Sequence, residues 1–235
     1  MNINICNKDY DLDSLSIKVD NLLSVLFQIK ELSNRSLAFR SGCKSGVCGS
    51  CAIRVNGVEK LACKTKINNN DIVEPLKNTQ VIKDLIVDIS FQEKSLKNTK
   101  TYLQDQSTQI TTQQDQELID KETNCILCNS CFSACPIYEV NKDFIPPFAL
   151  ARAYRYTVDK KQSNPKEIID AVQKNGIWDC TLCGSCNMVC PANIDIKGDI
   201  LQLRNKSAQF GYNDPNFNNM NNDFNTNFGF DPNSF

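Results

Sequence analysis

Two stretches of the sequence share one cysteine pattern: CILCNSCFSACP at residues 125–136 and CTLCGSCNMVCP at residues 180–191. Each reads Cys-x-x-Cys-x-x-Cys-x-x-x-Cys-Pro. A cubane iron–sulfur cluster presents four iron corners, and three sulfurs at two-residue gaps let one short loop wrap three of them. In chains with two such clusters, the cysteine before proline binds the cluster of the other run. The repeat therefore predicts two [4Fe–4S] clusters that exchange their fourth ligands.

The exchange fixes two predicted ligand sets. The first cluster is held by Cys125, Cys128, Cys131 and Cys190. The second is held by Cys135, Cys180, Cys183 and Cys186. Pro136 and Pro191 end the two loops and direct the fourth sulfur away from its own run.

Structural zinc sites are the alternative interpretation of these cysteines. Such sites mostly use two Cys-x-x-Cys pairs separated by a longer gap. Three evenly spaced cysteines followed by Cys-Pro match the ferredoxin pattern better. We therefore expect iron as the metal, bound through these same cysteines.

A third site is predicted in FRSGCKSGVCGSCAIRVNGVEKLAC, residues 39–63, where the ligands are Cys43, Cys48, Cys51 and Cys63. The first three have the Cys-x4-Cys-x2-Cys spacing of a plant-type [2Fe–2S] loop, and the fourth follows soon after an Asn-Gly pair. Gly42, Gly46 and Gly49 provide backbone that can turn with positive φ and approach the inorganic sulfides.

Four other residues near these motifs have simpler interpretations. Arg40 and Lys44 flank the [2Fe–2S] loop and read as exposed surface charge, with a role at a partner or in tuning the potential as the alternative. Cys6 reads as a small buried residue on a β segment. Trp178, two residues before Cys180, reads as packing beside a cluster.

The composition favours metal over disulfides. The chain has 13 cysteines and no histidine in 235 residues. An odd number of closely spaced cysteines, without a signal peptide, argues against a disulfide framework. The absence of histidine removes the commonest imidazole ligand and proton shuttle. We expect no substrate-catalytic residue in this chain.

The net charge and the hydropathy of the chain bear on its binding partners and its cellular location. The formal net charge of −1 gives no indication of nucleic-acid binding. No stretch approaches about 18 consecutive apolar residues, so no segment is expected to span a bilayer unaided. The N-terminal MNINICNKDYDLD lacks the basic and apolar regions of a signal peptide, which predicts a cytosolic location.

The chain divides into four predicted parts. Residues 1–95 read as a β-rich domain, and residues 96–121 as a polar linker with one short helix. Residues 122–206 form a helical domain around the two cysteine runs. The Asn-rich residues 207–235 read as a disordered tail, with a docking tail that orders on a partner as the alternative.

Local patterns predict several elements in the β-rich part. The alternation of Leu15, Ile17 and Val19 predicts a strand. Asp20 then precedes a helix that ends near Leu32. Asn56-Gly57 predicts a tight hairpin, and DIVEPL, residues 71–76, a further strand.

Two helices are predicted between the cysteine runs. The first opens at the Pro146-Pro147 pair, because proline is favoured at the first helical position. The second ends at the stop residues Lys174, Asn175 and Gly176.

The combination resembles the iron–sulfur subunit of the succinate dehydrogenase/fumarate reductase family over residues 1–206. Beyond the cysteines, the similarity is carried by FRSGCKSGVCGSC (39–51), EPLKNTQVIKDLIVD (74–88), CPIYEVNKDFIPP (135–147), ALARAYRY (149–156) and NGIWDC (175–180). The last is more similar to fumarate reductase than to succinate dehydrogenase. The resemblance implies an α+β fold: a β-grasp [2Fe–2S] ferredoxin domain followed by an α-helical two-cluster ferredoxin domain.

The resemblance also implies an electron-transfer role. The chain would relay electrons between a flavoprotein subunit with covalent FAD and a membrane quinone or cysteine-rich electron-carrier subunit. Its complex would interconvert succinate and fumarate, in the tricarboxylic acid cycle or anaerobic respiration. The alternative is the iron–sulfur wire of another flavin-linked oxidoreductase that acts on a thiol/disulfide or 2-hydroxyacid couple. The expected location is peripheral, on the cytoplasmic side of the inner membrane, with export alongside a signal-bearing partner left open.

Three departures from the commoner family pattern bear on the far end of this relay. Most members lack a cysteine at the position of Cys183 and hold [3Fe–4S]; the cysteine here implies a second [4Fe–4S], or [3Fe–4S] if Cys183 is not a ligand. Ala192 stands where the family usually has lysine near the quinone site. Residues 138–140 read Tyr-Glu-Val in place of a tryptophan pair. Together they favour a carrier subunit over direct contact with quinone.

Overall fold

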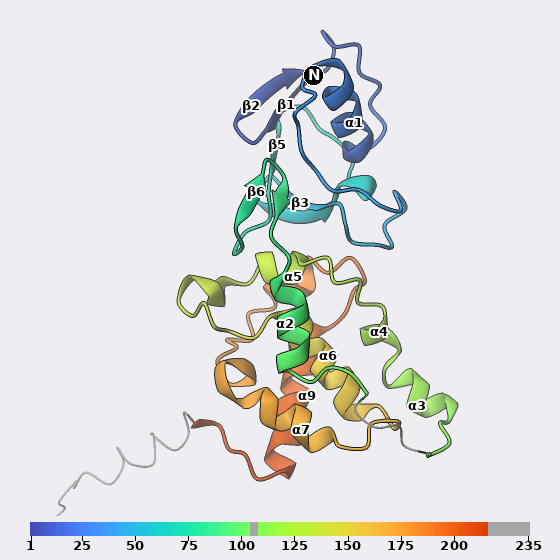
Figure 1. Cartoon of the computed structure of the whole chain (residues 1–235), viewed down its shortest axis with the longest axis vertical. Helices are drawn as coiled ribbons and strands as arrows, with labels where there is room; N and C mark the ends of the chain where they lie inside the picture. The colour runs from blue at the N-terminus through green and yellow to red at the C-terminus, as the bar shows by residue number, and fades with distance from the viewer. Residues whose placement is uncertain (104–107, 216–235) are drawn as a thin grey trace, which may run out of the picture.

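The computed structural model describes residues 1–103 and 108–215. Two parts are stacked along the long axis of the molecule, with a β-rich N-terminal part above a helical C-terminal part (Figure 1). Each part has its own hydrophobic core. The fold is therefore α+β, as predicted.

A mixed five-stranded sheet forms the N-terminal part, with the strand order β2-β1-β5-β3-β4. Its strands are β1 (Asn2–Ile5), β2 (Lys8–Asp11), β3 (Ala52–Val55), β4 (Val58–Leu61) and β5 (Asp71–Glu74). β1 and β5 are parallel, and the other neighbours are antiparallel. Asn56 and Gly57, with φ of 51° and 80°, turn the chain between β3 and β4, which confirms the hairpin predicted from this pair.

The helix α1 (Leu22–Leu32) contributes its apolar side to the core of this part. The predicted helix is confirmed, but its N-cap is Asn21 and not Asp20. The Asn21 side chain accepts a hydrogen bond from the Ser24 amide at 3.0 Å, and the Ser24 hydroxyl accepts one from the Asn21 amide at 3.3 Å. This capping box fixes the first turn.

The strand predicted through Leu15, Ile17 and Val19 is wrong. These residues form turns and an irregular segment, Ser16 has φ of 53°, and Val19 is 43% exposed. The chain has to reverse here to pass from β2 to α1, and the Ile17 amide bonds to the Leu12 carbonyl at 2.9 Å instead of to a neighbouring strand. Alternation alone does not produce a strand where the backbone has to turn.

Cys6 also departs from its prediction. It lies in the turn between β1 and β2 with φ of 49°, and it is half-buried and not part of a strand. Burial raises the pKa of its thiol to about 11, and the nearby acidic groups Asp84 and Glu74 add to the shift.

The chain leaves the N-terminal part through a small hairpin and a helix. β6 (Val81–Lys83) pairs with β7 (Ile86–Val87), and α2 (Phe91–Asn98) follows. The Phe91 ring lies 4.4 Å from that of Phe132, so α2 packs on the helical core. The boundary predicted near residue 95 therefore falls inside α2.

Where the structure describes the predicted linker, at residues 96–103 and 108–121, two short helices occur after α2 instead of the one expected. They are α3 (Gln113–Glu117) and α4 (Asp120–Thr123). Thr112 and Asp115 form a capping box at the start of α3, which makes this short helix possible in a polar sequence.

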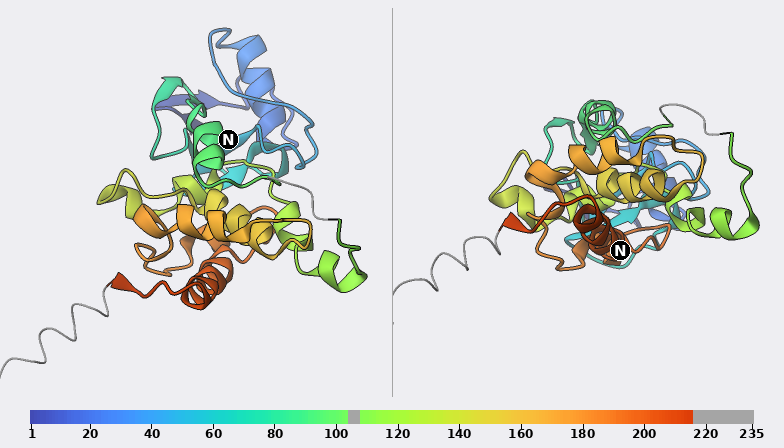
Figure 2. Two further views of the ribbon diagram at one scale, coloured as in Figure 1. Left: turned by 60° about the horizontal axis from the view of Figure 1, so that its bottom comes forward. Right: turned by 90° about the horizontal axis from the view of Figure 1, so that it is seen from below.

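The helical part is built around α6 (Pro147–Val158), which packs against α7 (Pro165–Ala171) and α9 (Ile196–Gln209) (Figure 2). Short elements carry the cysteine runs: α5 (Ser130–Ser133), the 3-10 turn η2 (Pro136–Glu139) and α8 (Ser185–Met188). A second 3-10 turn in the N-terminal part, η1 (Ala62–Lys64), carries Cys63.

The helix predicted at the proline pair is confirmed, with Pro147 as the first residue of α6. The second predicted helix ends earlier than expected, at Ala171. The segment η3 (Gln173–Ile177) that follows contains non-helical backbone, including Asn175 at φ of 53°.

The helix α9 was not predicted, and it continues to Gln209, past the tail boundary expected at residue 206. Beyond it, the Tyr212 hydroxyl donates to Asp170 at 2.7 Å, so this segment packs on the helical part. The rest of the predicted tail, residues 216–235, lies outside the described residues. Within the described ranges, no helix is long and apolar enough to cross a membrane.

A buried acidic pair joins α4 to α9. Asp199 and Glu122 are 4% and 7% exposed. Burial and the neighbouring Glu122 carboxyl raise the pKa of Asp199 to about 8, and Asp195 adds to this while Lys121 opposes it. The native state therefore retains a proton that the unfolded chain releases near pH 4, the usual range of an aspartate.

Stability should consequently fall as the pH rises from about 4 towards 8, because ionisation favours the unfolded chain. We expect Asp199→Asn to flatten this slope in urea unfolding measured at several pH values. The exposed Asp143→Asn is the control and should keep the slope of the parent protein. An unchanged slope in Asp199→Asn would contradict the assignment.

Candidate metal centres

The loop that contains Cys43 and Cys48 folds around sulfur. The Cys43 amide donates to the Cys48 Sγ at 3.3 Å, and the amides of Ser45 and Val47 donate to the Cys43 Sγ at 3.4 Å each. Hydrogen bonds from Ser45, through side chain and backbone, and from the Val47 amide lower the pKa of Cys43 to about 5. This thiol is thus prepared as a thiolate, the form that binds metal.

Cys51 and Cys63 complete this group from the interior. Cys51 directly precedes β3, and the β3–β4 hairpin returns the chain to Cys63 in η1. Both are buried. Burial raises the pKa of Cys51 to about 11, and the adjacent Cys63 and Cys48 thiols contribute. The structure brings the four cysteines of the predicted [2Fe–2S] site together.

Glycine is required beside these sulfurs. A Cβ at Gly42 would lie 2.9 Å from the Cys48 Sγ, and Gly46 and Gly49 have φ of 86° and 72°. Side chains at these positions would collide with the thiol or strain the loop. The backbone therefore forms a cradle of the kind that a cluster with exposed sulfides needs.

The two long cysteine runs adopt the same backbone turn. Leu127 and Asn129 in the first run have φ of 51° and 66°, and Leu182 and Gly184 at the matching positions have φ of 55° and 81°. A short helix, α5 or α8, begins directly after each turn. The repeat in sequence is thus a repeat in conformation.

The first run meets the last cysteine of the second. A small apolar cavity is lined by Phe148, Ala151 and four cysteines: Cys125, Cys128, Cys131 and Cys190. Burial raises the pKa of Cys131 well above its usual range, and the thiols of Cys128, Cys125, Cys186 and Cys190 add to the shift. This is the predicted first cubane set, gathered in one place.

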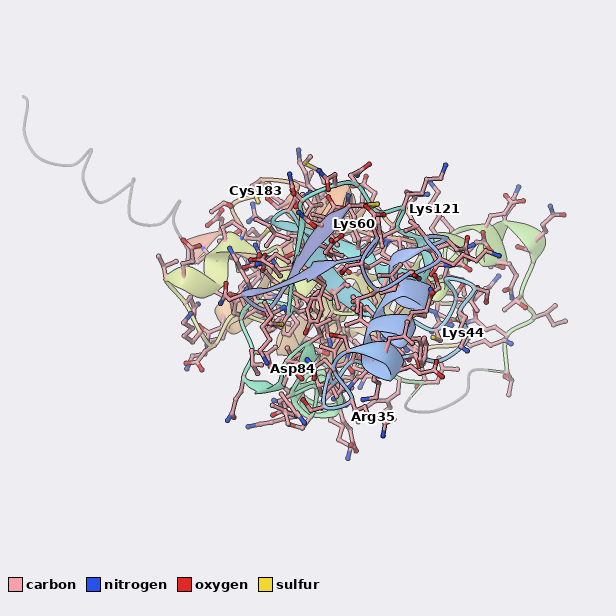
Figure 3. The ribbon with its side chains drawn as sticks, turned by 90° about the horizontal axis from the view of Figure 1, so that it is seen from above. Arg35, Lys44, Lys60, Asp84, Lys121 and Cys183 are labelled. Atoms are coloured by element: carbon pink, nitrogen blue, oxygen red, sulfur yellow. The ribbon has the colours of Figure 1, made fainter. Side chains whose placement is uncertain are left out.

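The second predicted set is gathered around α8. Burial raises the pKa of Cys186 to about 12, and the nearby thiols that add to this shift are Cys180, Cys135 and Cys183. Cys183 itself is exposed, and Figure 3 places it at the rim of the molecule, on the side of Lys60 and opposite Arg35. Burial alone would raise its pKa, but hydrogen bonds from the Ser185 hydroxyl and amide prevail and lower it.

A site for a single metal ion needs its side chains closer together than a site for a cluster does. Among residues 1–103 and 108–215, no three Cys, Asp or Glu side chains converge closely enough to hold one metal ion. A cluster of several irons spreads its thiolates over a wider cage than one ion does.

Arg204, which the sequence patterns missed, helps to hold the second cysteine run in place. Arg204 on α9 donates to the carbonyl oxygens of Ile177 at 2.8 Å and Cys180 at 2.7 Å, and its guanidinium lies 5.5 Å from the Trp178 ring centre. Trp178 donates to Gln173 at 2.8 Å, so it packs beside the second run as predicted. Arginines that cap distant loops carry no local sequence signal.

The charged residues that flank the [2Fe–2S] loop differ in exposure. Lys44 is exposed, and its ammonium lies 4.9 Å from the centre of the Phe27 ring on α1. Arg40, in contrast, is half-buried and lines a pocket between the two parts of the chain. The prediction of plain surface charge therefore holds better for Lys44.

Comparison with known proteins assigns both parts. Residues 4–94 match the family described as 2Fe-2S iron-sulfur cluster binding domain, and residues 122–194 match the 4Fe-4S dicluster domain. The chain is 34% identical over 220 residues to the 8-methylmenaquinol:fumarate reductase iron-sulfur subunit of Wolinella succinogenes, covering 87% of this chain and 69% of that one. It is 35% identical over 199 residues to the fumarate reductase iron-sulfur subunit of Escherichia coli O6:H1, covering 80% and 82%.

The chain belongs to the succinate dehydrogenase/fumarate reductase iron–sulfur subunit family. A chain of the Mycobacterium smegmatis Sdh1 complex in the apo form has the same fold, with a TM-score of 0.76 at 22% identity over 88% of this chain and 91% of that one. Membership of the family confirms the predicted class: an oxidoreductase subunit with [2Fe–2S] and [4Fe–4S] clusters.

Arg204 provides a test of how the second run is held. Arg204→Met keeps much of the packing but removes hydrogen bonds to partly buried carbonyl oxygens, which costs about 1 kcal/mol of unfolding free energy. Urea unfolding should detect this loss. The exposed neighbour Asn205→Met should change stability by less than about 0.5 kcal/mol. Equal effects of the two variants would show that the carbonyl contacts contribute nothing.

Proposed function

We propose that this chain carries electrons between a flavoprotein subunit and a membrane-associated electron-carrier subunit of a succinate dehydrogenase/fumarate reductase complex. The observation that supports this is the exposure of the twelve cysteines. The [2Fe–2S] group and the second cubane group each have one exposed thiol, Cys43 and Cys183, while the middle group has none. A relay needs an accessible group at each end and a shielded group between them.

The side chains fit the clusters that we assign to them. All twelve donors are thiols, and the loops around them supply backbone amides aimed at sulfur, such as Leu182 to the Cys180 Sγ and Ile194 to the Cys190 Sγ at 3.4 Å. Iron–sulfur clusters, when bound, accept and release single electrons at potentials set by such hydrogen bonds and by exposure. The residues themselves bind, shield and space these clusters, and they move no proton.

The chain is proposed to divide its work between two domains. The β-grasp domain would hold the [2Fe–2S] cluster through Cys43, Cys48, Cys51 and Cys63 and face the FAD-carrying flavoprotein. The helical domain would hold two cubanes and present Cys183 to the carrier subunit. Met188 and Val140, 88% and 87% exposed, belong to this domain and suit burial against that subunit.

The substrates of the complex follow from its relatives. The Wolinella succinogenes relative is named for 8-methylmenaquinol and fumarate, and we propose the same chemical classes here: a quinol, oxidised in the membrane subunit, and fumarate, reduced in the flavoprotein. Ala192 at the edge of the first cubane cavity offers no charged group to a quinone, so quinone contact is assigned to the partner. The chain would then lie at the membrane surface, bound through that partner.

Isolation of the native complex tests this proposal. We expect a brown preparation with iron and acid-labile sulfide, a co-purified subunit with covalent FAD, and fumarate reduction with a reduced viologen dye. A colourless, zinc-containing protein would restore the structural-metal alternative. Clusters without fumarate reduction, but with activity on a thiol/disulfide couple, would assign the chain to another flavin-linked oxidoreductase.

Cys183 decides the type of the outermost cluster. Cys183→Ser should lose one iron and keep the fold, because the thiol is exposed. Low-temperature EPR of the oxidised variant should then show the sharp, near-isotropic [3Fe–4S] signal, which the parent protein lacks.

Cys6→Ser is the matched control for this substitution, since Cys6 lies outside all three groups and should keep the full iron content. A [3Fe–4S] signal in the parent protein that survives reconstitution with iron and sulfide would refute the role given to Cys183.

A further inference from the structure

The [2Fe–2S] loop lies directly against the first cysteine run. A Cβ added to Gly49 would come within 2.8 Å of the Cys128 Cβ and 2.9 Å of the Ile126 carbonyl oxygen. Neither neighbour is the flexible end of a side chain, so any residue larger than glycine would push the two loops apart. Gly49 lies between the proposed ligands Cys48 and Cys51. The nearest atoms belong to Ile126 and to Cys128, a proposed ligand of the first cubane cluster.

Hydrogen bonds hold this contact closed. Gln92 on α2 donates to the Leu127 carbonyl oxygen at 2.7 Å and to the Asn129 side chain at 2.9 Å, on either side of Cys128. Asn78 donates to the carbonyl oxygen of Phe132 at 2.9 Å, further along the same run. The contact between the loops is therefore fixed by groups on both sides.

A buried network supports the same junction. Ser133 on α5 donates to Glu59 on β4 at 2.7 Å and accepts from the Lys77 amide at 2.8 Å. Glu59 is 6% exposed and is paired with the buried Arg54. Breaking a buried network of this kind is costly, so the two parts of the chain cannot slide apart freely.

We propose that Gly49 is a positioning residue that sets the distance between the [2Fe–2S] group and the first cubane group. The inference rests on the proposed function. When the clusters are bound, Cys48 and Cys51 would hold the one that donates a single electron, and Cys128 and Cys131 the one that accepts it. Such a transfer would form or break no bond and move no proton. Because electron tunnelling falls steeply with distance, the missing side chain at Gly49 sustains the rate.

Gly46 offers a matched control in the same loop. Its φ of 86° resembles the 72° of Gly49, so alanine strains the backbone similarly at both positions. A Cβ at Gly46, however, would meet the Lys64 side chain, with the nearest atom at 2.6 Å, and a lysine chain can move away. Gly46→Ala therefore reproduces the strain without separating the two groups.

The test uses the full-length chain with its clusters, reduced with dithionite. The EPR signal of the [2Fe–2S] group saturates at a microwave power that rises when another paramagnetic group lies nearby. We expect Gly49→Ala to lower the half-saturation power several-fold, with full iron content, while Gly46→Ala stays close to the parent protein. The rate of electron equilibration between the two groups after photoreduction should fall in Gly49→Ala alone.

The outcomes separate this inference from the proposed function. A parent protein without iron–sulfur signals would refute the proposed function. Three clusters in every variant, with the same half-saturation power in Gly49→Ala as in the parent, or with equal changes in both glycine variants, would overturn the role of Gly49 alone.

If Gly49→Ala fails to assemble its [2Fe–2S] cluster, the Gln92→Ala variant tests the proposal in its place. It leaves both cysteine loops intact but removes the two bonds beside Cys128, so the half-saturation power should again fall. A Gln92→Ala variant that saturates like the parent protein would then overturn the proposal.

Discussion

The juxtaposition of the two cysteine runs is the constraint on which the helical part depends. Cys190 is among the thiols that act on Cys131 in the first run, and Cys135 is among those that act on Cys186 in the second. In the ligand sets that we propose, neither run completes its site alone, so the two loops have to lie side by side; α5 contacts α8 accordingly. α6 and α9 then pack around this paired core, with Phe148 and Ile196 lining the cavity of the first group.

A second constraint acts at the junction of the two parts. Two charged residues, Arg54 and Glu59, are buried there, and burial of ions is favourable only when their partners are complete. Glu59 completes its set through Ser133, which lies between Cys131 and Cys135. The sheet of the β-rich part is thus bonded to the helix that presents the cubane ligands, and the positions of the cluster loops are coupled to the fold.

The spacing of residues in the sequence predicted those features that depend on neighbouring residues. The cysteine runs, the Asn56-Gly57 hairpin and the proline start of α6 depend on neighbours in sequence, and the structure has the expected turns and helix there. The strand predicted through Ile17 failed because the chain turns back on Leu12 between β2 and α1, which alternation does not reveal. Arg204 and the contact of Gly49 with Cys128 join segments about 25 to 80 residues apart, and no local pattern encodes such meetings.

The ionisation of the thiols differs with their exposure. Hydrogen bonds lower the pKa of Cys43 and Cys183, both exposed, whereas burial raises the pKa of Cys131. A cluster binds thiolates, so its assembly releases protons, and this costs most where water is excluded. In the ligand sets that we propose, cluster binding at the middle group would therefore be coupled to the packing of α5 and α6 around the buried Cys131.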